Sequence, residues 1–275
     1  MERYWVNGSP GRLIDIEDRG LAYGDGLFET IAIRYSKLRF LDFHLDRLYA
    51  GATRLNLPVP DRHWLGIQLA GAIAGIEAGV MKLILTRGPG PRGYAPPLHQ
   101  QPTVAWGVER LSPVAWTQIR VRWCETIAGR SAATAGLKTL GRIEQVLARA
   151  EWQDVAIAEG LMCDEDGLLV GGTASNVFII SDGRLLTPAI TRSGICGVMR
   201  RIVMQQARET GIEVHETQIG RTELLHADEL FVSNALTGIR PVRQLDDRHW
   251  SPGPVTRRLA ALIADLGVDE CSGNC

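Results

Sequence analysis

Lys138 is the residue of this sequence best suited to covalent chemistry. It lies in the segment 133–140, where its neighbours are small or apolar and a helix is expected to follow. An amine in such surroundings has a lowered pKa, and the neutral amine is the form that makes a Schiff base. Lys138 is also one of only three lysines, the others being Lys37 and Lys82. A solvated lysine near a helix end is the alternative, and it is the commoner case.

A second group of residues could hold a phosphate. The small residues of the segment 193–200 run directly into a predicted helix, whose first free N–H groups, those of Val198 and Met199, would face an anion. Arg47, on an earlier predicted helix, could add a bidentate contact. An ion pair of Arg47 with Asp42 or Asp46 is the simpler alternative.

These side chains need helices and strands to position them, and the first part of the chain predicts a mixture of both. Residues 27–35 are rich in β-forming types, and apolar residues recur at helical spacing from about residue 42 until Pro58. Residues 61–78 are predicted to form a second helix. The remaining predicted elements are strands at 4–7, 81–85 and 103–108, with a Gly/Pro loop at 87–94.

A second domain is expected to begin after a polar segment. We predict a smaller N-terminal domain over residues 1–108, a linker over 109–117, and a larger C-terminal domain over 118–275 that carries Lys138. The mixed order of strands and helices indicates a two-domain α/β or α+β protein. The predicted elements of the second domain are strands at 119–123 and 229–233, helices at 141–152, 198–210 and 255–266, and hairpin turns at 164–167 and 181–183.

Composition narrows the class of protein. The net charge is −1, so no charge pattern typical of nucleic-acid or membrane binding is present. The first residues lack the apolar core of a signal peptide, and five scattered cysteines indicate reduced thiols, so a cytoplasmic location is expected. Cys271 and Cys275 lie four residues apart without a nearby second ligand pair, so no metal site is expected.

Six segments, in order along the chain, together resemble the fold-type IV pyridoxal-phosphate enzymes, the family of the branched-chain aminotransferases. They are the ranges 18–30, 43–48, 136–146, 173–178, 194–200 and 227–231. Each alone is unspecific, but six in register are specific because independent chance matches multiply. The resemblance implies the two-domain architecture of D-amino acid aminotransferase, pyridoxal 5'-phosphate as cofactor, a small-molecule substrate and a homodimer.

The resemblance also assigns roles to residues. Lys138 would be the catalytic residue that holds the cofactor. The cofactor-binding residues would be Arg47, Lys138, Asn176, Val198, Met199, Ala235 and Leu236, the N–H groups of the last two facing the phosphate. The substrate pocket would contain Phe28, Thr30, Arg92 and Tyr94, of which Arg92 and Tyr94 would face a carboxylate or ring. An exposed Gly/Pro loop with a solvated arginine is the alternative for those two, and the part played by Glu29 and Thr30 within the pocket stays open.

Two segments resemble the lyase branch of the family. The loop 87–94 and the segment 233–242 are similar to those of enzymes that convert aminodeoxychorismate into 4-aminobenzoate and pyruvate for folate biosynthesis. The alternatives are an aminotransferase that acts on a D- or branched-chain amino acid, and a non-catalytic or altered-chemistry relative that binds a phosphorylated ligand.

One position departs from the family pattern. A Glu usually stands five residues before the Asn of the Asn-x-Phe motif, where it keeps the pyridine nitrogen of the cofactor protonated. In this sequence that position is Gly171. A weaker electron sink would hurt transamination more than a reaction whose product gains aromaticity.

Overall fold

A computed structural model describes residues 3–273 and divides the chain into two compact units. The first unit contains Met1–Pro113 and Leu137–Gly141, and the second contains Val114–Gly136 and Arg142–Cys275. The change at Pro113 falls inside the expected linker. The division differs from the sequence expectation in one segment, because Leu137–Gly141, with Lys138, belongs to the first unit.

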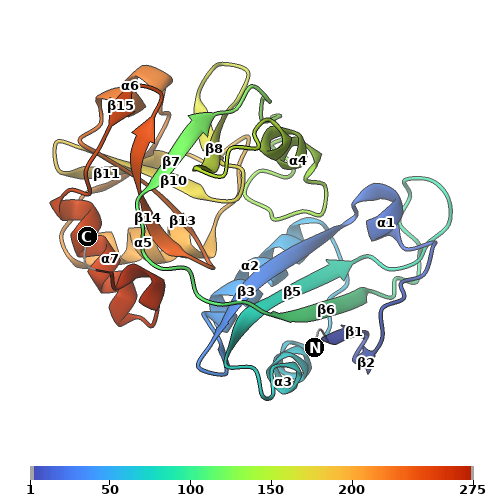
Figure 1. Cartoon of the computed structure of the whole chain (residues 1–275). Coiled ribbons are helices and arrows are strands. Elements are labelled where there is room, and N and C mark those ends of the chain that lie inside the picture. The colour runs from blue at the N-terminus through green and yellow to red at the C-terminus, as the bar shows by residue number, and fades with distance from the viewer. Residues whose placement is uncertain (1–2, 274–275) are drawn as a thin grey trace. The chain divides into compact units, whose positions relative to one another are not determined.

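The first unit is built on a six-stranded antiparallel sheet (Figure 1). Its strand order is β2-β1-β6-β5-β3-β4. The elements are β1 (Arg3–Val6), β2 (Ser9–Pro10), α1 (Arg19–Tyr23), β3 (Gly26–Arg34), β4 (Lys37–Leu38), α2 (Leu41–Arg54), α3 (Arg62–Ala72), β5 (Ala78–Thr86) and β6 (Thr103–Arg110).

Alternation along β3 decides which side chains of the first unit are buried in its core. Leu27, Ile31 and Ile33 join the apolar core formed with α2 and α3. Because successive side chains of a strand point to opposite faces, Phe28 and Thr30 lie on the other face of the sheet. The second helix is shorter than predicted: α3 ends at Ala72, and Gly75, with a φ of 75°, turns the chain into β5.

The second unit is built on a nine-stranded mixed sheet, in which β12-β11-β10-β13-β14-β7-β8-β9 follow one another and β15 pairs with β14. Its elements are β7 (Ile119–Trp123), α4 (Ile143–Ala150), β8 (Ile157–Cys163), β9 (Leu169–Gly172), β10 (Asn176–Ser181), β11 (Arg184–Pro188), α5 (Val198–Glu209), β12 (Val214–Thr217), α6 (Arg221–His226), β13 (Glu229–Asn234), β14 (Gly238–Leu245), β15 (Arg248–His249), α7 (Pro254–Asp265) and the 3₁₀ turn η1 (Asp269–Cys271).

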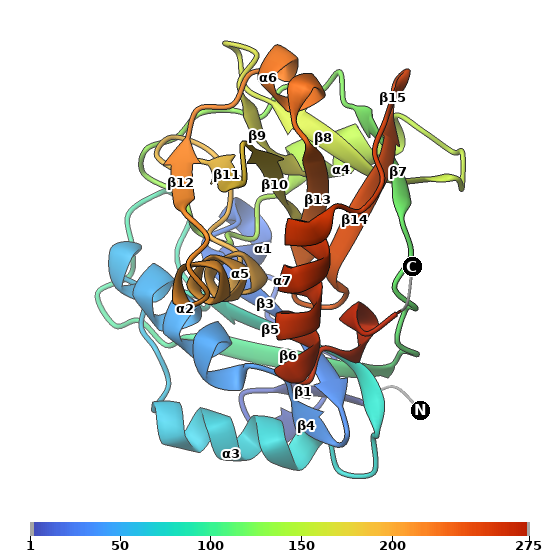
Figure 2. The same cartoon turned by 90° about the vertical axis from the view of Figure 1, so that its left-hand side faces the viewer.

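Helices α5 and α7 pack side by side within the second unit, next to β13 (Figure 2). Phe178 and Phe231 stack with ring centroids 4.9 Å apart where β10 and β13 pair. Cys271 is buried in η1, where its sulfur accepts a hydrogen bond from the N–H of Ile239, whereas Cys275 lies outside the described residues. Within residues 3–273, no helix is long and apolar enough to cross a membrane.

Candidate active site

Lys138 is held against the start of β3 by backbone hydrogen bonds. The N–H of Phe28 donates to the carbonyl of Lys138 at 2.9 Å, and the N–H of Leu140 donates to Gly26 at 3.1 Å. These long-range contacts are the reason that the lysine segment belongs to the first unit. The Lys138 Nζ lies 4.2 Å from the centroid of the Phe28 ring, a cation–π distance. The structure therefore brings together Lys138 and Phe28.

Arg47 is paired with Glu29 of β3. Its Nε donates to Glu29 Oε1 at 2.8 Å and its Nη2 to Oε2 at 2.5 Å, which is a bidentate fork. Asp42 and Asp46, the partners considered from the sequence, both contact Arg62 instead. The fork uses the Nε and Nη2 donors and fixes the plane of the guanidinium.

His44 completes this buried cluster. Its Nδ1 lies 2.6 Å from Glu29 Oε2, and both side chains are 1% exposed. Burial by itself would raise the pKa of Glu29, but the hydrogen bonds from His44 and Arg47 outweigh it, and the pKa lies below its ordinary value. Burial lowers the pKa of His44, and the positive charges of Arg47 and Lys138 act in the same direction against the hydrogen bond to Glu29. A neutral His44 therefore donates from Nδ1 to an ionised Glu29.

Sequence reasoning missed the part played by Glu29 and His44. A signal was present, since His44 and Arg47 stand three residues apart and so share one face of a helix. That spacing does not predict which strand residue, here Glu29, contacts the two side chains. The Nε2 of His44 is buried and has no hydrogen-bond partner among the described residues.

In the second unit, the start of α5 has the properties of an anion-binding site. The helix begins at Val198, as predicted, and no side chain within residues 3–273 caps that end. The first N–H groups of the helix, including those of Val198 and Met199, can therefore serve an anion. This part of the second unit fits a phosphate group.

Asn176 shapes the turn that leads into α5. Its Nδ2 donates to the carbonyl of Ile195 at 2.9 Å. A Cβ added at Gly197 would lie 2.0 Å from Asn176 Oδ1, so only glycine fits at that position. The predicted cofactor residue Asn176 thus acts on the shape of the turn.

The turn after β13 is closed by the side chain of Asn234. The side-chain oxygen of Asn234 accepts hydrogen bonds from the N–H groups of Leu236 and Thr237, both at 2.9 Å. The N–H of Leu236, which was expected to face a phosphate, is therefore engaged within the turn. An Asn at the end of a strand commonly closes such a turn with its own side chain. The phosphate contact expected of the Ala235 N–H stays a prediction.

Gly171 lies in β9, opposite Met162 of β8. Glu159 of β8 is a buried carboxylate two positions before Leu161, the partner of Gly172. The Glu159 carboxylate accepts hydrogen bonds from the adjacent residue of β8 and from the loop that follows β9. The donors are the N–H groups of Gly160, Thr173 and Ala174 and the hydroxyls of Thr173 and Ser175. Glu159 therefore holds the loop that precedes Asn176.

The loop that carries Arg92 and Tyr94 is ordered by Arg19. The buried guanidinium of Arg19 donates to the carbonyls of Gly93 at 2.8 Å and Tyr94 at 3.1 Å. The Tyr94 ring packs edge-on against Tyr23, yet the residue is 86% exposed, and Arg92 is exposed as well. The structure thus fixes the backbone of this loop and leaves both predicted substrate residues open to solvent.

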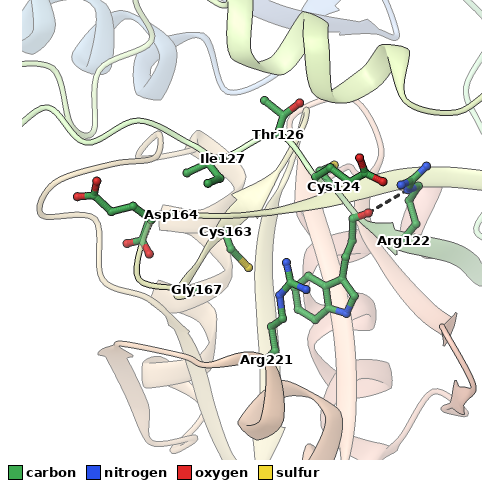
Figure 3. Close-up of a pocket in the computed structure, with 11 residues that line it drawn as sticks. Arg122, Cys124, Thr126, Ile127, Cys163, Asp164, Gly167 and Arg221 are labelled. Carbon is green, nitrogen blue, oxygen red and sulfur yellow. Dashed lines mark hydrogen bonds between the residues drawn. The ribbon is translucent and has the colours of Figure 1, made fainter.

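A cavity of about 500 Å³ lies elsewhere in the second unit and includes none of the predicted site residues (Figure 3). Arg221 lies over the ring of Trp123, 4.8 Å from its centroid, and burial raises the pKa of Cys124 to about 12. Arg122 is already paired with Glu151. Since carboxylates and arginines both line the cavity, its charge favours neither anions nor cations.

Comparison with known proteins identifies the class to which this fold and these residues belong. Residues 26–245 match the amino-transferase class IV family, and the chain belongs to that family. The resemblance expected from the six sequence segments is thereby confirmed, as is the two-domain fold-type IV architecture.

Particular relatives come from more than one branch of the family. The chain is 33% identical over 267 residues to an aminodeoxychorismate lyase of Vibrio harveyi, covering 93% of this chain and 97% of that one. A solved 4-amino-4-deoxychorismate lyase of Pseudomonas aeruginosa is 41% identical, has a TM-score of 0.90, and is covered over 98% of its chain and 95% of this one. A putative branched-chain-amino-acid aminotransferase of Methanocaldococcus jannaschii is 29% identical over 262 residues, with 92% of this chain and 91% of that one covered.

Proposed function

We propose that the protein is a pyridoxal-phosphate-dependent 4-amino-4-deoxychorismate lyase that releases 4-aminobenzoate and pyruvate. The observation that carries the proposal is the placement of Lys138 over the Phe28 ring of β3, the strand that also carries Glu29, the partner of Arg47 and His44. The greater similarity to lyases than to the aminotransferase compared above supports this branch of the family. We further propose a cytoplasmic homodimer that serves folate biosynthesis.

Each unit offers groups that suit the cofactor. In the first unit, we assign its covalent attachment to Lys138 and a phosphate contact to Arg47, whose fork with Glu29 fixes the guanidinium. In the second unit, we assign a phosphate contact to the N–H groups at the start of α5. When bound, pyridoxal phosphate supplies an electron sink for the carbon that carries the substrate amine.

Lys138 is also the residue that we assign to proton transfer. Its amine, once released by the substrate amine, removes the proton from the carbon that carries the substrate nitrogen. The ring gains aromaticity as the carbon–oxygen bond to the enolpyruvyl group breaks, and that group takes up a proton and leaves as pyruvate. No amino group is transferred to a second substrate, so no 2-oxo acid is required.

A product assay tests the reaction. Purified protein with pyridoxal phosphate and aminodeoxychorismate should yield pyruvate and 4-aminobenzoate in equal amounts, measured by a coupled lactate dehydrogenase assay and by fluorescence. Equal yields without any added 2-oxo acid support the lyase. Failure to form either product by a protein that binds the cofactor would contradict it.

The second candidate is an aminotransferase, favoured by the likeness to the Methanocaldococcus jannaschii protein. It would use the same Lys138 and the same phosphate-binding groups. Exchange of amino groups between a D- or branched-chain amino acid and a 2-oxo acid would identify it. Gly171 speaks against this candidate, because the position offers no carboxylate to the cofactor.

A further inference from the structure

Helix α4 of the second unit turns apolar side chains toward solvent. Its exposed positions include Ile143, Val146, Leu147 and Ala150, which have the i, i+3, i+4 and i+7 spacing of one helix face. An apolar stripe with this spacing normally faces the core of a protein. In α4 it faces solvent, and the side chains of Ile143, Val146 and Leu147 are 67%, 61% and 54% exposed.

Contacts on the inward side of α4 fix this orientation. Ala148 is fully buried in a small apolar cluster of the second unit. Glu144 accepts a hydrogen bond from the N–H of Gly129 at 3.1 Å, and Glu151, directly after the helix, accepts two from N–H groups of the same loop, both at 2.8 Å. These three residues share one face because they are spaced by four and three positions. The loop over residues 125–129 therefore holds the carboxylates inward and leaves the apolar stripe outside.

The stripe carries no charge of its own. Arg149, which borders it, donates to the carbonyl of Trp152 at 3.0 Å, and its guanidinium lies 4.6 Å from the centroid of that ring. Because Glu144 is bound to Gly129, both charged side chains of α4 are held by their own unit. A nucleic acid or an anionic lipid surface would require free cations beside the stripe. A second apolar protein surface fits it instead.

The exposed area of the stripe suits the centre of a dimer contact. The exposed parts of its three large side chains amount to roughly 300 Å², as much as the largest apolar patch of many monomers. A stable interface buries about 800 Å² on each partner, so surrounding surface must add the rest. Ile127, on the loop bound to α4, and Val155, in the turn after the helix, are 57% and 99% exposed and offer more apolar surface. A second copy of the chain brings an identical stripe, and a two-fold axis pairs the two stripes with each other.

We propose that the apolar stripe of α4 is the centre of the contact between two copies of this chain. The inference rests on the homodimer of the proposed function and deepens it by naming the surface. The α4 helices of the two copies pack against each other, and the small side chain of Ala150 lets them approach closely at that end. Each copy then covers the apolar surface of the other, while the inward side of each α4 stays on its own unit.

Three variants test the contact by sedimentation of the holoprotein. Val146→Asp places a charge in the stripe of both copies, Val146→Ile keeps the stripe apolar, and Ile67→Asp is the matched control on α3, where Ile67 is 56% exposed. Thermal unfolding and cofactor absorbance are recorded first to show that each variant folds. The unsubstituted protein, Val146→Ile and Ile67→Asp should sediment at twice the mass of the chain. Val146→Asp should raise the dissociation constant of the dimer roughly 100-fold, because two like charges would be buried against each other.

Cross-linking gives a second readout that leaves the contact intact. Val146→Cys, treated with a short bismaleimide and mapped by mass spectrometry, should yield a peptide joined to its own copy through position 146, and Ile67→Cys should yield no such peptide at position 67. A monomeric unsubstituted protein, a Val146→Asp dimer as stable as that of Ile67→Asp, or absence of the linked peptide would each overturn the inference. None of these measurements uses substrate, so failure of a stable dimer to form pyruvate would instead reject the proposed lyase reaction.

Discussion

At the scale of single residues, the chemistry depends on which charges lie next to one another. Lys138 could be chosen from its small and apolar neighbours in the sequence, together with the scarcity of lysine. The cluster of Glu29, His44 and Arg47 could not, because Glu29 is 18 residues from Arg47 and lies on a strand while Arg47 lies on a helix. Local patterns show helical spacing within α2 but not the strand residue that it meets.

Replacing Glu29 with Gln should weaken binding of pyridoxal phosphate by roughly 10-fold, because the amide holds the Arg47 guanidinium less firmly than the ionised fork does. Fluorescence titration of the apoprotein measures the dissociation constant. Pyridoxal without its phosphate should bind equally well to the variant and to the unsubstituted protein. The control is Asp46→Asn, which removes an exposed pair with Arg62 on the same helix. A folded Glu29→Gln variant that binds the phosphate form as tightly as before would contradict the role given to Glu29.

The same cluster predicts how stability changes with pH. The pKa of His44 in the folded protein lies below its ordinary value of 6.5, so the unfolded chain binds more protons at this residue as the pH falls. The stability associated with neutral His44 is therefore complete above about 6.5 and is lost as the pH falls toward the folded pKa. Glu29, whose pKa is also lowered, adds a second loss below its ordinary value of 4.5.

Unfolding temperatures measured from pH 8 to pH 4 should show these two losses, and His44→Asn should remove the first of them. His215→Asn, at an exposed pair with Glu213, should leave the curve unchanged. A curve for His44→Asn that falls between pH 6.5 and pH 5 as steeply as that of the unsubstituted protein would disagree with the assignment.

At the scale of elements, the start of α5 is the feature that the sequence predicted best. A run of small residues into an amphipathic segment placed the first helical residue at Val198, where the structure has it. The shape of the preceding turn was not predictable, since it depends on Asn176, more than twenty positions before the helix. Substituting Gly197 with Ala would push a Cβ against Asn176 Oδ1.

We expect Gly197→Ala to weaken binding of the phosphate cofactor by at least about 10-fold, because the displaced turn carries the N–H groups that serve the anion. Gly66→Ala on α3 is the control, because a Cβ there meets nothing within 4 Å. Cofactor titration with circular dichroism separates lost binding from lost helix. Unchanged affinity in Gly197→Ala would show that the start of α5 does not bind the phosphate.

The strand β9 offers a test of reaction type. Gly171→Glu restores the carboxylate that the family usually has, and its Cβ would lie 3.1 Å from the carbonyl of Ser175, so that neighbour must shift slightly. We expect faster half-transamination of ordinary amino acids in this variant than in the unsubstituted protein, followed by the change in cofactor absorbance. Fast half-transamination by the unsubstituted protein itself would refute the idea that Gly171 disfavours that reaction.

At the scale of the whole molecule, the sequence predicted two domains joined by a linker over residues 109–117, and the structure divides the chain at Pro113. The comparisons establish the family. The sequence placed Lys138 in the C-terminal domain, because sequence position suggested nothing else. The structure assigns the segment Leu137–Gly141 to the first unit through backbone pairing with residues more than a hundred positions earlier. The order of residues along the chain does not show that a segment of the second half pairs with a strand of the first unit. For this reason the contact of Lys138 with Phe28 was not predicted.

The attachment site of the cofactor is the most direct measurement of the central claim, and the chain's three lysines make its outcome unambiguous. The holoenzyme is reduced with borohydride, digested, and mapped by mass spectrometry. Phosphopyridoxyl modification at Lys138 alone, absent from Lys138→Ala, is the result that we predict. Modification at Lys82 or Lys37, or none in a protein shown to bind the cofactor, would contradict the assignment of Lys138.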